Sequence, residues 1–311
     1  MYGVSAVFLK IGGSSLVSIL AAPQNGVMTK HLLSFGHGYS ARAVTPLLLD
    51  QGWEVAGTTR SAEKTHEISA SGVQPVIWPG DDLSNVLEQA DALLISTGPT
   101  ADGCPVLNDQ AKAIVEHAPH LKWVGYLSTT GVYGDHQGGW VDEDTALTPT
   151  TRRGEWRKAA EEAWQDLARN CDLPLHIFRL AGIYGPRRGP FAKVRAGTAR
   201  RIIKKNQVFS RIHVEDIAQV LIASLHKPDP GRIYNVCDDE AAPPQDVLTE
   251  AARMLGMDLP PEEDYETAEM TPMARSFYAE SKRVRNDRIK SELGVTLKYP
   301  SYRTGLRALL D

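Results

Sequence analysis

The amino-acid sequence predicts an α/β protein, a doubly wound parallel sheet with a smaller C-terminal α/β lobe. Three features of the sequence lead to this prediction. Strand-like apolar runs alternate with helical patterns from residue 30 to about residue 185. The first run ends in a glycine-rich turn that leads into a helix. The run at 92–96 is apolar almost throughout, as in parallel strands that are buried on both faces of a sheet.

Length and composition place the chain among globular proteins. Of its 311 residues, 42% are hydrophobic and 23% are charged, which is enough to bury a large core. The net charge of −4 gives no basic field for nucleic acid, and the three cysteines are too widely spaced for a disulfide framework or a zinc site. We expect a cytoplasmic protein that acts on a small molecule, without nucleic acid, membrane or metal. The sequence leaves its oligomeric state open.

Residues 1–27 differ from the rest of the chain. They have an apolar tendency, but a glycine- and serine-rich stretch at 12–15 divides them, so they are too short and too broken to span a membrane. A signal peptide would need a basic start, and no Lys or Arg precedes Lys10. We expect this segment to be an extension whose deletion leaves folding unchanged.

The segment 30–60 predicts a strand, a glycine turn, a helix and a second strand. Its turn fits G-x-G-x-x-A, the small-residue variant of the dinucleotide-binding fingerprint. The first glycine permits a tight turn, the second leaves room for a pyrophosphate, and the alanine lets the helix approach the strand with its first N–H groups facing the anion. The predicted cofactor-binding residues of this turn are Gly36, His37, Gly38, Tyr39, Ser40 and Ala41.

The end of the second strand selects between the two nicotinamide cofactors. A carboxylate there accepts hydrogen bonds from the ribose hydroxyls of NAD, whereas an arginine accommodates the 2′-phosphate of NADP. No Asp or Glu occupies the last positions of this strand, which is followed by Arg60 and Ser61. We therefore predict that these two residues bind NADP, and that NAD is the less favoured cofactor. The alternative is that Arg60 is only a solvated charge at the start of the next helix.

The alternation continues with a helix at 62–70, a strand at 73–78, a helix at 83–90 and the strand at 92–96. In a doubly wound sheet the loops beyond the carboxyl ends of the strands line the ligand crevice. We therefore expect Gly98 and Pro99 beside the cofactor, and Asp82 and Leu83 near its adenine. The alternative for these four residues is ordinary turn chemistry.

A helix at 106–117 and a strand at 122–127 lead into the loop Ser-Thr-Thr-Gly-Val-Tyr-Gly at 128–134. An acidic residue follows at Glu143, the pattern R-x-x-x-x-Y-G-P covers 179–186, and H-V-x-D-x-A covers 213–218. Together these segments resemble an extended short-chain dehydrogenase, over most of residues 29–311. The resemblance implies a Rossmann sheet, an NAD(P) cofactor, and a loop hydroxyl that hydrogen-bonds the reacting oxygen of the substrate.

The chain departs from that family on the helix after the loop. Family members place a Tyr and a Lys four residues apart there, and the Lys lowers the pKa of the Tyr so that the phenol can exchange a proton. This chain has Arg153 and Arg157 in those places. Arginine is not a proton donor of tunable pKa, but two arginines on one helix face can hold a phosphate or a carboxylate. The alternative is that Arg153 and Arg157 are only solvated charges on the surface of the helix. The glycine turn, the Ser-Thr-Thr loop and the helix without the Tyr are together similar to an atypical subgroup of short-chain dehydrogenases, which is described as NAD-dependent epimerase/dehydratase-like.

The resemblance supplies the candidate catalytic residues Ser128, Thr129 and Tyr133 and the candidate substrate-binding residues Glu143, Arg153, Arg157 and Tyr184. In this assignment Thr129 is in register with the catalytic Ser/Thr of the family, and the proton comes from Tyr133, Tyr184, Glu143 or water. The alternative for Tyr133 and Tyr184 is that both are core aromatics whose hydroxyls form hydrogen bonds inside the protein. The function implied is that of an epimerase/dehydratase-like protein or oxidoreductase for a small polar substrate, nucleotide-linked ones included. The alternative is a catalytically inactive sensor of NADP(H).

Residues 28–185 are thus the expected NAD(P)-binding domain, rejoined by about 209–237, and residues 186–311 the substrate lobe. Beyond 186 the pattern predicts helices at 191–203, 216–225, 244–255, 271–277, 282–293 and 302–310, with strands at 209–214 and 232–236. His213 either faces ligand or anchors the turn into its helix. We expect the lobe to cap the crevice and to select the substrate.

Overall fold

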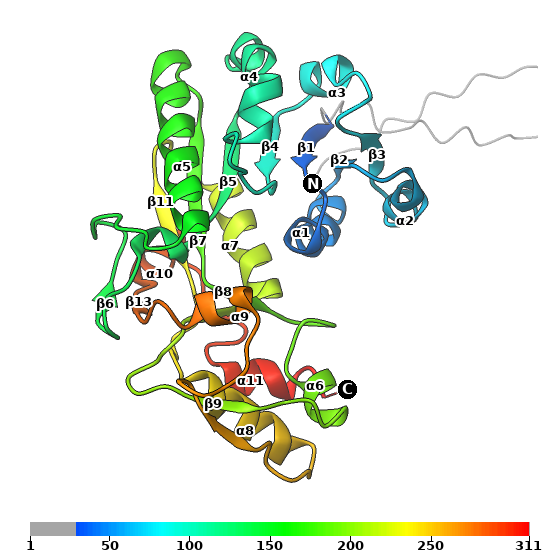
Figure 1. Cartoon of the computed structure of the whole chain (residues 1–311). Helices are drawn as coiled ribbons and strands as arrows, with labels where there is room; N and C mark the ends of the chain where they lie inside the picture. Colours follow the sequence, from blue (N-terminus) through cyan, green and yellow to red (C-terminus); the bar gives the residue numbers. More distant parts are fainter. Residues whose placement is uncertain (1–28, 311) are drawn as a thin grey trace, which may run out of the picture.

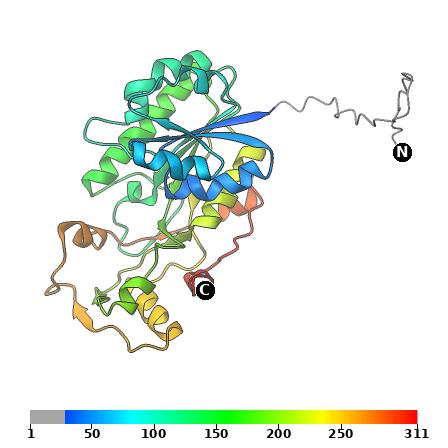
Figure 2. The ribbon, with the colours of Figure 1, turned by 90° about the vertical axis from the view of Figure 1, so that its right-hand side faces the viewer.

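A computed structural model describes residues 29–310 and shows a parallel sheet of seven strands flanked by helices, with a smaller lobe beyond one end of the sheet (Figures 1 and 2). The predicted α/β fold class is therefore confirmed. The predictions for residues 1–27 lie outside the described residues. No helix among residues 29–310 has the length and apolar character needed to cross a bilayer.

The first part of the chain alternates strands and helices as the sequence predicts. Its elements are β1 (Lys30–Phe35), α1 (Tyr39–Leu49), β2 (Trp53–Thr59), the 3-10 helix η1 (Ala62–Lys64), α2 (Thr65–Ala70), β3 (Gln74–Ile77), α3 (Ser84–Glu88), β4 (Ala92–Ile95), α4 (Pro105–His117), β5 (Trp123–Thr129) and the 3-10 helix η2 (Thr130–Tyr133). The strand at 92–96 is β4, and its four residues are all buried, in agreement with its apolar run.

The remaining elements close the sheet and build the lobe. They are β6 (Trp140–Val141), α5 (Arg152–Cys171), β7 (Leu175–Leu180), β8 (Gly182–Tyr184), α6 (Phe191–Arg195), β9 (Arg201–Ile203), β10 (Arg211–His213), α7 (Val214–His226), β11 (Ile233–Val236), α8 (Pro244–Met254), β12 (Glu262–Asp264), α9 (Pro272–Phe277), β13 (Arg283–Val284), α10 (Asp287–Ser291) and α11 (Tyr302–Arg307). Strand β11 returns to the main sheet, beside β7.

The strand order is β11-β7-β5-β4-β1-β2-β3, so the winding direction reverses between β1 and β4. Residues Leu32 to Phe35 of β1 pair with Ala92 to Ile95 of β4, and the other side of β1 pairs with β2. Ligands of doubly wound sheets bind at such a switch point, beyond the carboxyl ends of the strands. We therefore expect the ligand-binding residues in the loops that follow β1, β2, β4 and β5.

The period-two alternation of the strands divides the core between the two faces of the sheet. Leu32 of β1 belongs to an apolar cluster under α1 and α7, which contribute Leu48 and Val220. The next residue, Leu33, belongs to a cluster on the other face under α4 and α5, which contribute Ile114 and Trp164 among others. Because both faces are covered, the central strands are apolar almost throughout.

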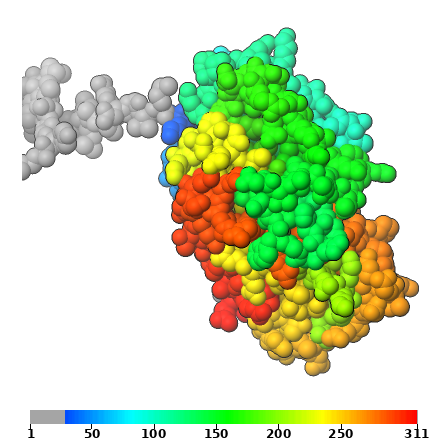
Figure 3. All heavy atoms as spheres, turned by 90° about the vertical axis from the view of Figure 1, so that its left-hand side faces the viewer, coloured from blue at the N-terminus to red at the C-terminus, as the bar shows by residue number. Residues whose placement is uncertain are grey.

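Two segments of the C-terminal half differ from the sequence prediction. The helix expected over 191–203 stops at Arg195, because Gly197 adopts a left-handed backbone with φ +66°, and residues 201–203 form β9, which pairs with β12. The helix expected over 282–293 is shortened to α10, because residues 283–284 form β13 and pair with β6. Figure 3 shows the green segment that contains β6 against the orange segment that contains β13. In both places a long-range strand pairing overrides a local helical pattern.

The strand expected at 209–214 is present but does not enter the main sheet. Residues Arg211 to His213 form β10, which pairs with β8 in a separate two-stranded sheet. His213 is fully buried there, and its Nδ1 accepts a hydrogen bond from the backbone N–H of Glu215 at the start of α7. This contact fits the anchoring alternative for His213.

Candidate cofactor and substrate crevice

The glycine turn after β1 has the backbone that a pyrophosphate site needs. Gly36 is left-handed at φ +79°, and a Cβ there would lie 2.9 Å from the side chain of Thr97, so only glycine fits. Its N–H donates to the Thr58 hydroxyl at 2.7 Å. A Cβ on Gly38 would meet only the Gly36 carbonyl oxygen, at 3.8 Å, which leaves the surface above Gly38 open. Helix α1 begins one residue later, at Tyr39, so its free N–H groups face this space.

The side chains of the turn point in different directions. Ser40 and Ala41 are buried where α1 meets the sheet. Tyr39 reaches across to the loop after β8, where its hydroxyl donates to the Pro186 carbonyl oxygen at 3.0 Å. His37 is turned inward over Gly57 of β2, where a Cβ would lie 2.6 Å from the imidazole ring. Of these four side chains, only that of Tyr39 therefore extends across the crevice.

His37 makes the stability of the fold depend on pH. Burial, and then the nearby charge of Arg42, lower the pKa of His37 from 6.5 to about 4. The unfolded chain binds this proton at a higher pH than the folded protein, so stability is lost as the pH falls from about 6.5 towards 4. We expect the free energy of unfolding to fall between pH 7 and pH 5 by roughly 2 kcal/mol more in the wild type than in His37→Gln. Denaturant titrations of both proteins at the two pH values measure this difference, and parallel pH profiles would contradict it.

The end of β2 presents a free positive charge. Arg60 is exposed and forms no ion pair with any residue in the range 29–310. Ser61 donates its N–H to the Thr59 hydroxyl at 3.2 Å and precedes η1. The neighbouring cation, Arg42 of α1, is already paired with Glu67 of α2. Arg60 is therefore the basic side chain of this strand end that is available to a ligand phosphate.

The loop before α3 has a local role in the structure. Asp82 accepts hydrogen bonds from the backbone N–H of Ser84 at 3.0 Å and from its hydroxyl at 2.6 Å, in the turn that precedes α3. Leu83 is buried in the core beneath it. These contacts fit the turn-chemistry alternative for both residues.

The ends of β4 and β5 form the other half of the crevice. The hydroxyls of Ser96 and Thr97 are buried and make no hydrogen bond within the described chain. Gly98 and Pro99 follow, and Gly98 is exposed. Buried hydroxyls without partners, beside an open glycine turn, suit a polar ligand that would complete their hydrogen bonds. The residues of this crevice therefore fit a dinucleotide cofactor.

The three hydroxyl residues predicted to do chemistry after β5 have different environments. Ser128 is buried and donates its hydroxyl to the carboxylate of Glu161. Thr129 is partly exposed, and its Oγ1 accepts from the N–H of Gly131 at 3.2 Å, which leaves the hydroxyl proton free. Tyr133 is fully buried, and its hydroxyl donates to Asn235 Oδ1 at 2.7 Å. Of the three, Thr129 alone keeps both exposure and a free donor.

The placement of Tyr133 fits its alternative as a core aromatic. Its hydroxyl also accepts a hydrogen bond from Arg179 Nη1 at 2.9 Å, so both of its polar functions are used inside the protein. Burial raises the pKa of Tyr133 to about 12. A buried phenol with a raised pKa is poorly suited to exchange protons near neutral pH.

The two arginines of α5 are not equivalent. Arg153 is exposed at the start of the helix. Arg157 is half-buried, and its Nη1 donates to the Leu127 carbonyl oxygen at 2.7 Å and to the Tyr126 hydroxyl at 3.2 Å. A Cβ on Gly98 would lie 3.4 Å from Nη2 of Arg157. Arg157 therefore lies between the carboxyl ends of β4 and β5, on the side of the sheet where doubly wound proteins bind their ligands.

Glu143 and Tyr184, the other predicted substrate contacts, are mostly buried. Glu143 accepts from the N–H of Asn235 at 2.8 Å, and burial raises the pKa of its carboxyl group. Tyr184 packs edge-on against His213, and its hydroxyl donates to the Ser301 carbonyl oxygen at 3.4 Å. Glu143 thus ties its loop to β11 of the main sheet, and Tyr184 ties β8 to the residue that precedes α11.

A buried ion pair below the loop was not among the predicted site residues. Arg179 of β7 binds Glu161 of α5 at 2.8 Å, and the two side chains are 3% and 1% exposed. The pair contacts Ser128 and Tyr133, so it supports both ends of the loop after β5. The signals in the sequence were an arginine inside an apolar strand and a glutamate on the apolar face of the helix.

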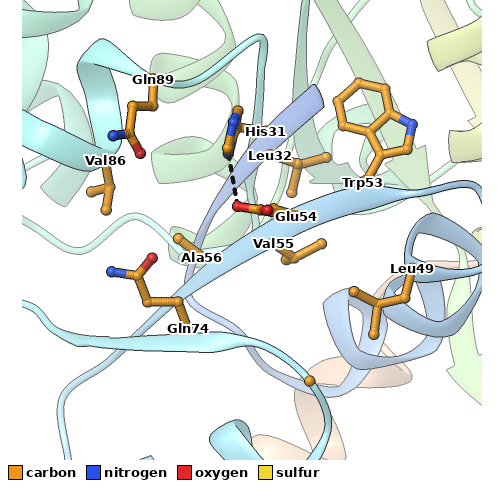
Figure 4. A pocket seen from close by; sticks show the side chains of 11 residues that line it. His31, Leu32, Leu49, Trp53, Glu54, Val55, Ala56, Gln74, Val86 and Gln89 are labelled. Carbon is orange, nitrogen blue, oxygen red and sulfur yellow. Dashed lines mark ion pairs between the residues drawn. The ribbon is translucent and has the colours of Figure 1, made fainter. Parts of the chain in front are cut away.

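A cavity of about 220 Å³ lies away from this crevice, at the amino ends of β1, β2 and β3 (Figure 4). His31 and Glu54, which form an ion pair at 3.5 Å, line it together with Trp53, Gln74 and Gln89. None of the predicted site residues lines this cavity. The glycine turn follows the carboxyl end of β1, so the cavity lies at the opposite end of the strands.

An open glycine turn at the switch point of a doubly wound sheet defines a dinucleotide-binding α/β protein. Comparison with known families agrees, since residues 36–228 match the NAD(P)H-binding family. The chain belongs to this family. NAD(P) binding is thereby established at the level of the family, with the choice between the two cofactors left to the residues of the crevice.

Similar proteins include two solved structures and one curated protein. A conserved protein of unknown function from Silicibacter pomeroyi DSS is 59% identical, with a TM-score of 0.85 over 90% of this chain and 98% of that one. The UDP-glucuronic acid 4-epimerase of Bacillus cereus, in complex with UDP-glucuronic acid and NAD, is 20% identical, with a TM-score of 0.73 over 90% of this chain and 97% of that one. At this identity the likeness to the epimerase concerns the fold alone.

The curated protein is the trifunctional UDP-glucose 4,6-dehydratase, UDP-4-keto-6-deoxy-D-glucose 3,5-epimerase and UDP-4-keto-L-rhamnose reductase of Arabidopsis thaliana. It is 26% identical over 169 residues, which are 49% of this chain. The match covers 24% of the plant protein, so the chain spans about a quarter of the length of this relative. Together the comparisons describe an epimerase/dehydratase-like, NAD(P)-binding fold.

Proposed function

We propose that the protein is an NADP(H)-dependent epimerase/dehydratase-like enzyme or oxidoreductase that acts on a small polar substrate. The observation that carries the proposal is the free hydroxyl proton of Thr129, at the end of β5 and beside the cofactor crevice. A donor at this place can hydrogen-bond the oxygen on the reacting carbon, where negative charge develops in the transition state. The bound cofactor supplies the hydride chemistry, and the chain supplies the binding and orientation.

Each part of the crevice has a role in this proposal. The backbone N–H groups at the start of α1 would hold the pyrophosphate, and Arg60 would hold the 2′-phosphate that distinguishes NADP from NAD. Thr129 orients the substrate oxygen. Because Tyr133, Tyr184 and Glu143 are all hydrogen-bonded within the protein, we propose water as the source of the proton.

The charge of the crevice favours an anionic substrate. Arg157 lies in the crevice and Arg153 is exposed one helical turn before it. Guanidinium groups bind phosphates and carboxylates well, which would suit a nucleotide-linked sugar. The Bacillus cereus epimerase of similar fold binds such a substrate together with NAD. The smaller lobe would select among substrates of this class.

Replacing Thr129 by Ala should lower turnover more than substrate binding. A hydroxyl that contacts a reacting oxygen acts most strongly in the transition state, so we expect kcat to fall roughly 100-fold or more with a smaller change in KM. Steady-state kinetics with NADPH and nucleotide sugars measures both constants. The matched control is Thr130→Ala, which removes a hydroxyl from the next residue of the loop and should change kcat little. A change in KM alone would make Thr129 a binding residue only.

The alternative function is an NADP(H) sensor that binds the cofactor without turnover. It is favoured by two observations, the arginines in the positions of the family's Tyr and Lys, and the commitment of the Ser128 hydroxyl to Glu161. A screen of carbonyl compounds and nucleotide sugars for NADPH oxidation separates the two functions. Oxidation above background with any of them supports the enzyme, and none above background with intact cofactor binding supports the sensor.

A further inference from the structure

Arg157 is a half-buried cation whose contacts in the described chain are all uncharged. Its Nη1 donates to the Leu127 carbonyl oxygen and the Tyr126 hydroxyl, and its guanidinium lies 5.6 Å from the centre of the Tyr126 ring. The carboxylate one turn further along α5, that of Glu161, is already paired with Arg179. A guanidinium is charged at every physiological pH. Its charge is therefore permanent and is compensated by no ion pair within residues 29–310.

The position of Arg157 in the sheet indicates which part of the cofactor would feel this charge. In a doubly wound sheet the adenosine half of a dinucleotide lies over the strand that follows the glycine-turn helix, here β2, where Arg60 is found. The other half lies across the switch point, over β4 and β5. Arg157 contacts the end of β5 through Leu127, and its Nη2 is next to Gly98 at the end of β4. It is thus at the nicotinamide half of the crevice.

We propose that the charge of Arg157 makes the crevice bind reduced nicotinamide cofactor in preference to the oxidised form. The oxidised nicotinamide ring carries one positive charge, and the reduced ring is neutral. The two forms are otherwise almost the same size and carry the same phosphates, so a fixed cation near the ring distinguishes them by repulsion alone. In a partly buried site this repulsion is screened less than in water.

A preference for the reduced cofactor would matter for an enzyme and for a sensor, and it requires neither function. A site that binds the reduced form more tightly makes reduction of the bound cofactor easier, because binding and redox equilibria are linked. An enzyme with such a site would release oxidised cofactor readily after reducing its substrate. A sensor with such a site would report on NADPH while NADP⁺ is also present. The inference goes beyond the proposed function, because it requires the cofactor and no substrate.

The test is a fluorescence titration of the full-length protein with NADPH and, separately, with NADP⁺ in competition with NADPH. The quantity measured is the ratio of the two dissociation constants, oxidised over reduced, which cancels the shared phosphate contacts. In Arg157→Gln, which keeps an N–H donor near Leu127, we expect this ratio to fall roughly tenfold, the effect of about 1.4 kcal/mol of charge repulsion. In Arg157→Lys, which keeps the charge, it should stay within about threefold of the wild type.

The matched control is Arg152→Gln, which removes a charge from an exposed position at the start of the same helix, outside the predicted site, and should leave the ratio unchanged. The ratio falling in Arg157→Gln alone supports the inference. An equal ratio in the wild type and Arg157→Gln overturns it while leaving the cofactor site intact. Failure of the wild type to bind either form would overturn the inference together with the cofactor site. If Arg157→Gln does not fold, as judged by its thermal transition, Arg157→Met is measured in the same way.

Discussion

Replacing Glu161 by Ala is expected to lower the free energy of unfolding by roughly 3–5 kcal/mol, because it leaves the buried guanidinium of Arg179 without its counter-charge. The two side chains are 1% and 3% exposed and lie 2.8 Å apart. The carboxylate also accepts the hydroxyl of Ser128, so the loop after β5 loses a support at the same time. Denaturant-induced unfolding, followed by intrinsic tryptophan fluorescence, measures the change.

The next residue on α5 provides the control for this prediction. Glu162 is 59% exposed and faces Lys158 at 4.0 Å, so Glu162→Ala should change stability by less than about 1 kcal/mol. A double variant in which Glu161 and Arg179 are both replaced by Met should recover much of the loss, since no buried charge then stays unpaired. A loss below about 1 kcal/mol in Glu161→Ala would show that the ion pair is not formed in the folded protein.

Replacing Arg60 by Glu is expected to weaken NADPH binding by roughly 2–4 kcal/mol. The change removes a charge-assisted hydrogen bond to the 2′-phosphate and adds repulsion from a carboxylate. NADH lacks this phosphate, and the new carboxylate can accept from its ribose hydroxyls, so its affinity should change little or improve. Titration of both nucleotides into both proteins by fluorescence quenching gives the four dissociation constants.

Arg152→Glu is the control for this charge reversal, because Arg152 is also exposed but lies at the start of α5 rather than at the end of β2. It should leave the preference between NADPH and NADH unchanged. A wild-type protein that prefers NADH, or an Arg60→Glu variant with an unaltered preference, would contradict the NADP assignment. Arg60 would then be a solvated charge before η1.

Most of the sheet could be predicted from the sequence because its signals are local. Parallel strands buried on both faces are short apolar runs, and the switch point follows from where the glycine turn lies in the strand order. The small lobe was predicted less well. Strands β9 and β13 are held by partners far away in the sequence, at residues 262–264 and 140–141, and no local pattern reveals such a pairing.

The crevice likewise has features that follow from local sequence and features that depend on long-range contacts. The conformation of Gly36 and the exposure of Arg60 follow from residue type and spacing, and both are as the sequence indicates. The bond from Ser128 to Glu161 and the bond from Tyr133 to Asn235 join residues 33 and 102 positions apart. Such contacts depend on the packed fold, so the sequence could not separate the available hydroxyl of Thr129 from the two that are used internally.

The structure of the full-length protein crystallised with NADPH tests the central claim most directly. We expect density for the pyrophosphate against the N–H groups at the start of α1, the adenosine phosphate beside Arg60, and the nicotinamide end between Gly98 and Thr129. Cofactor bound in the cavity at the amino ends of the strands, or bound in the crevice with its two ends exchanged, would contradict the account.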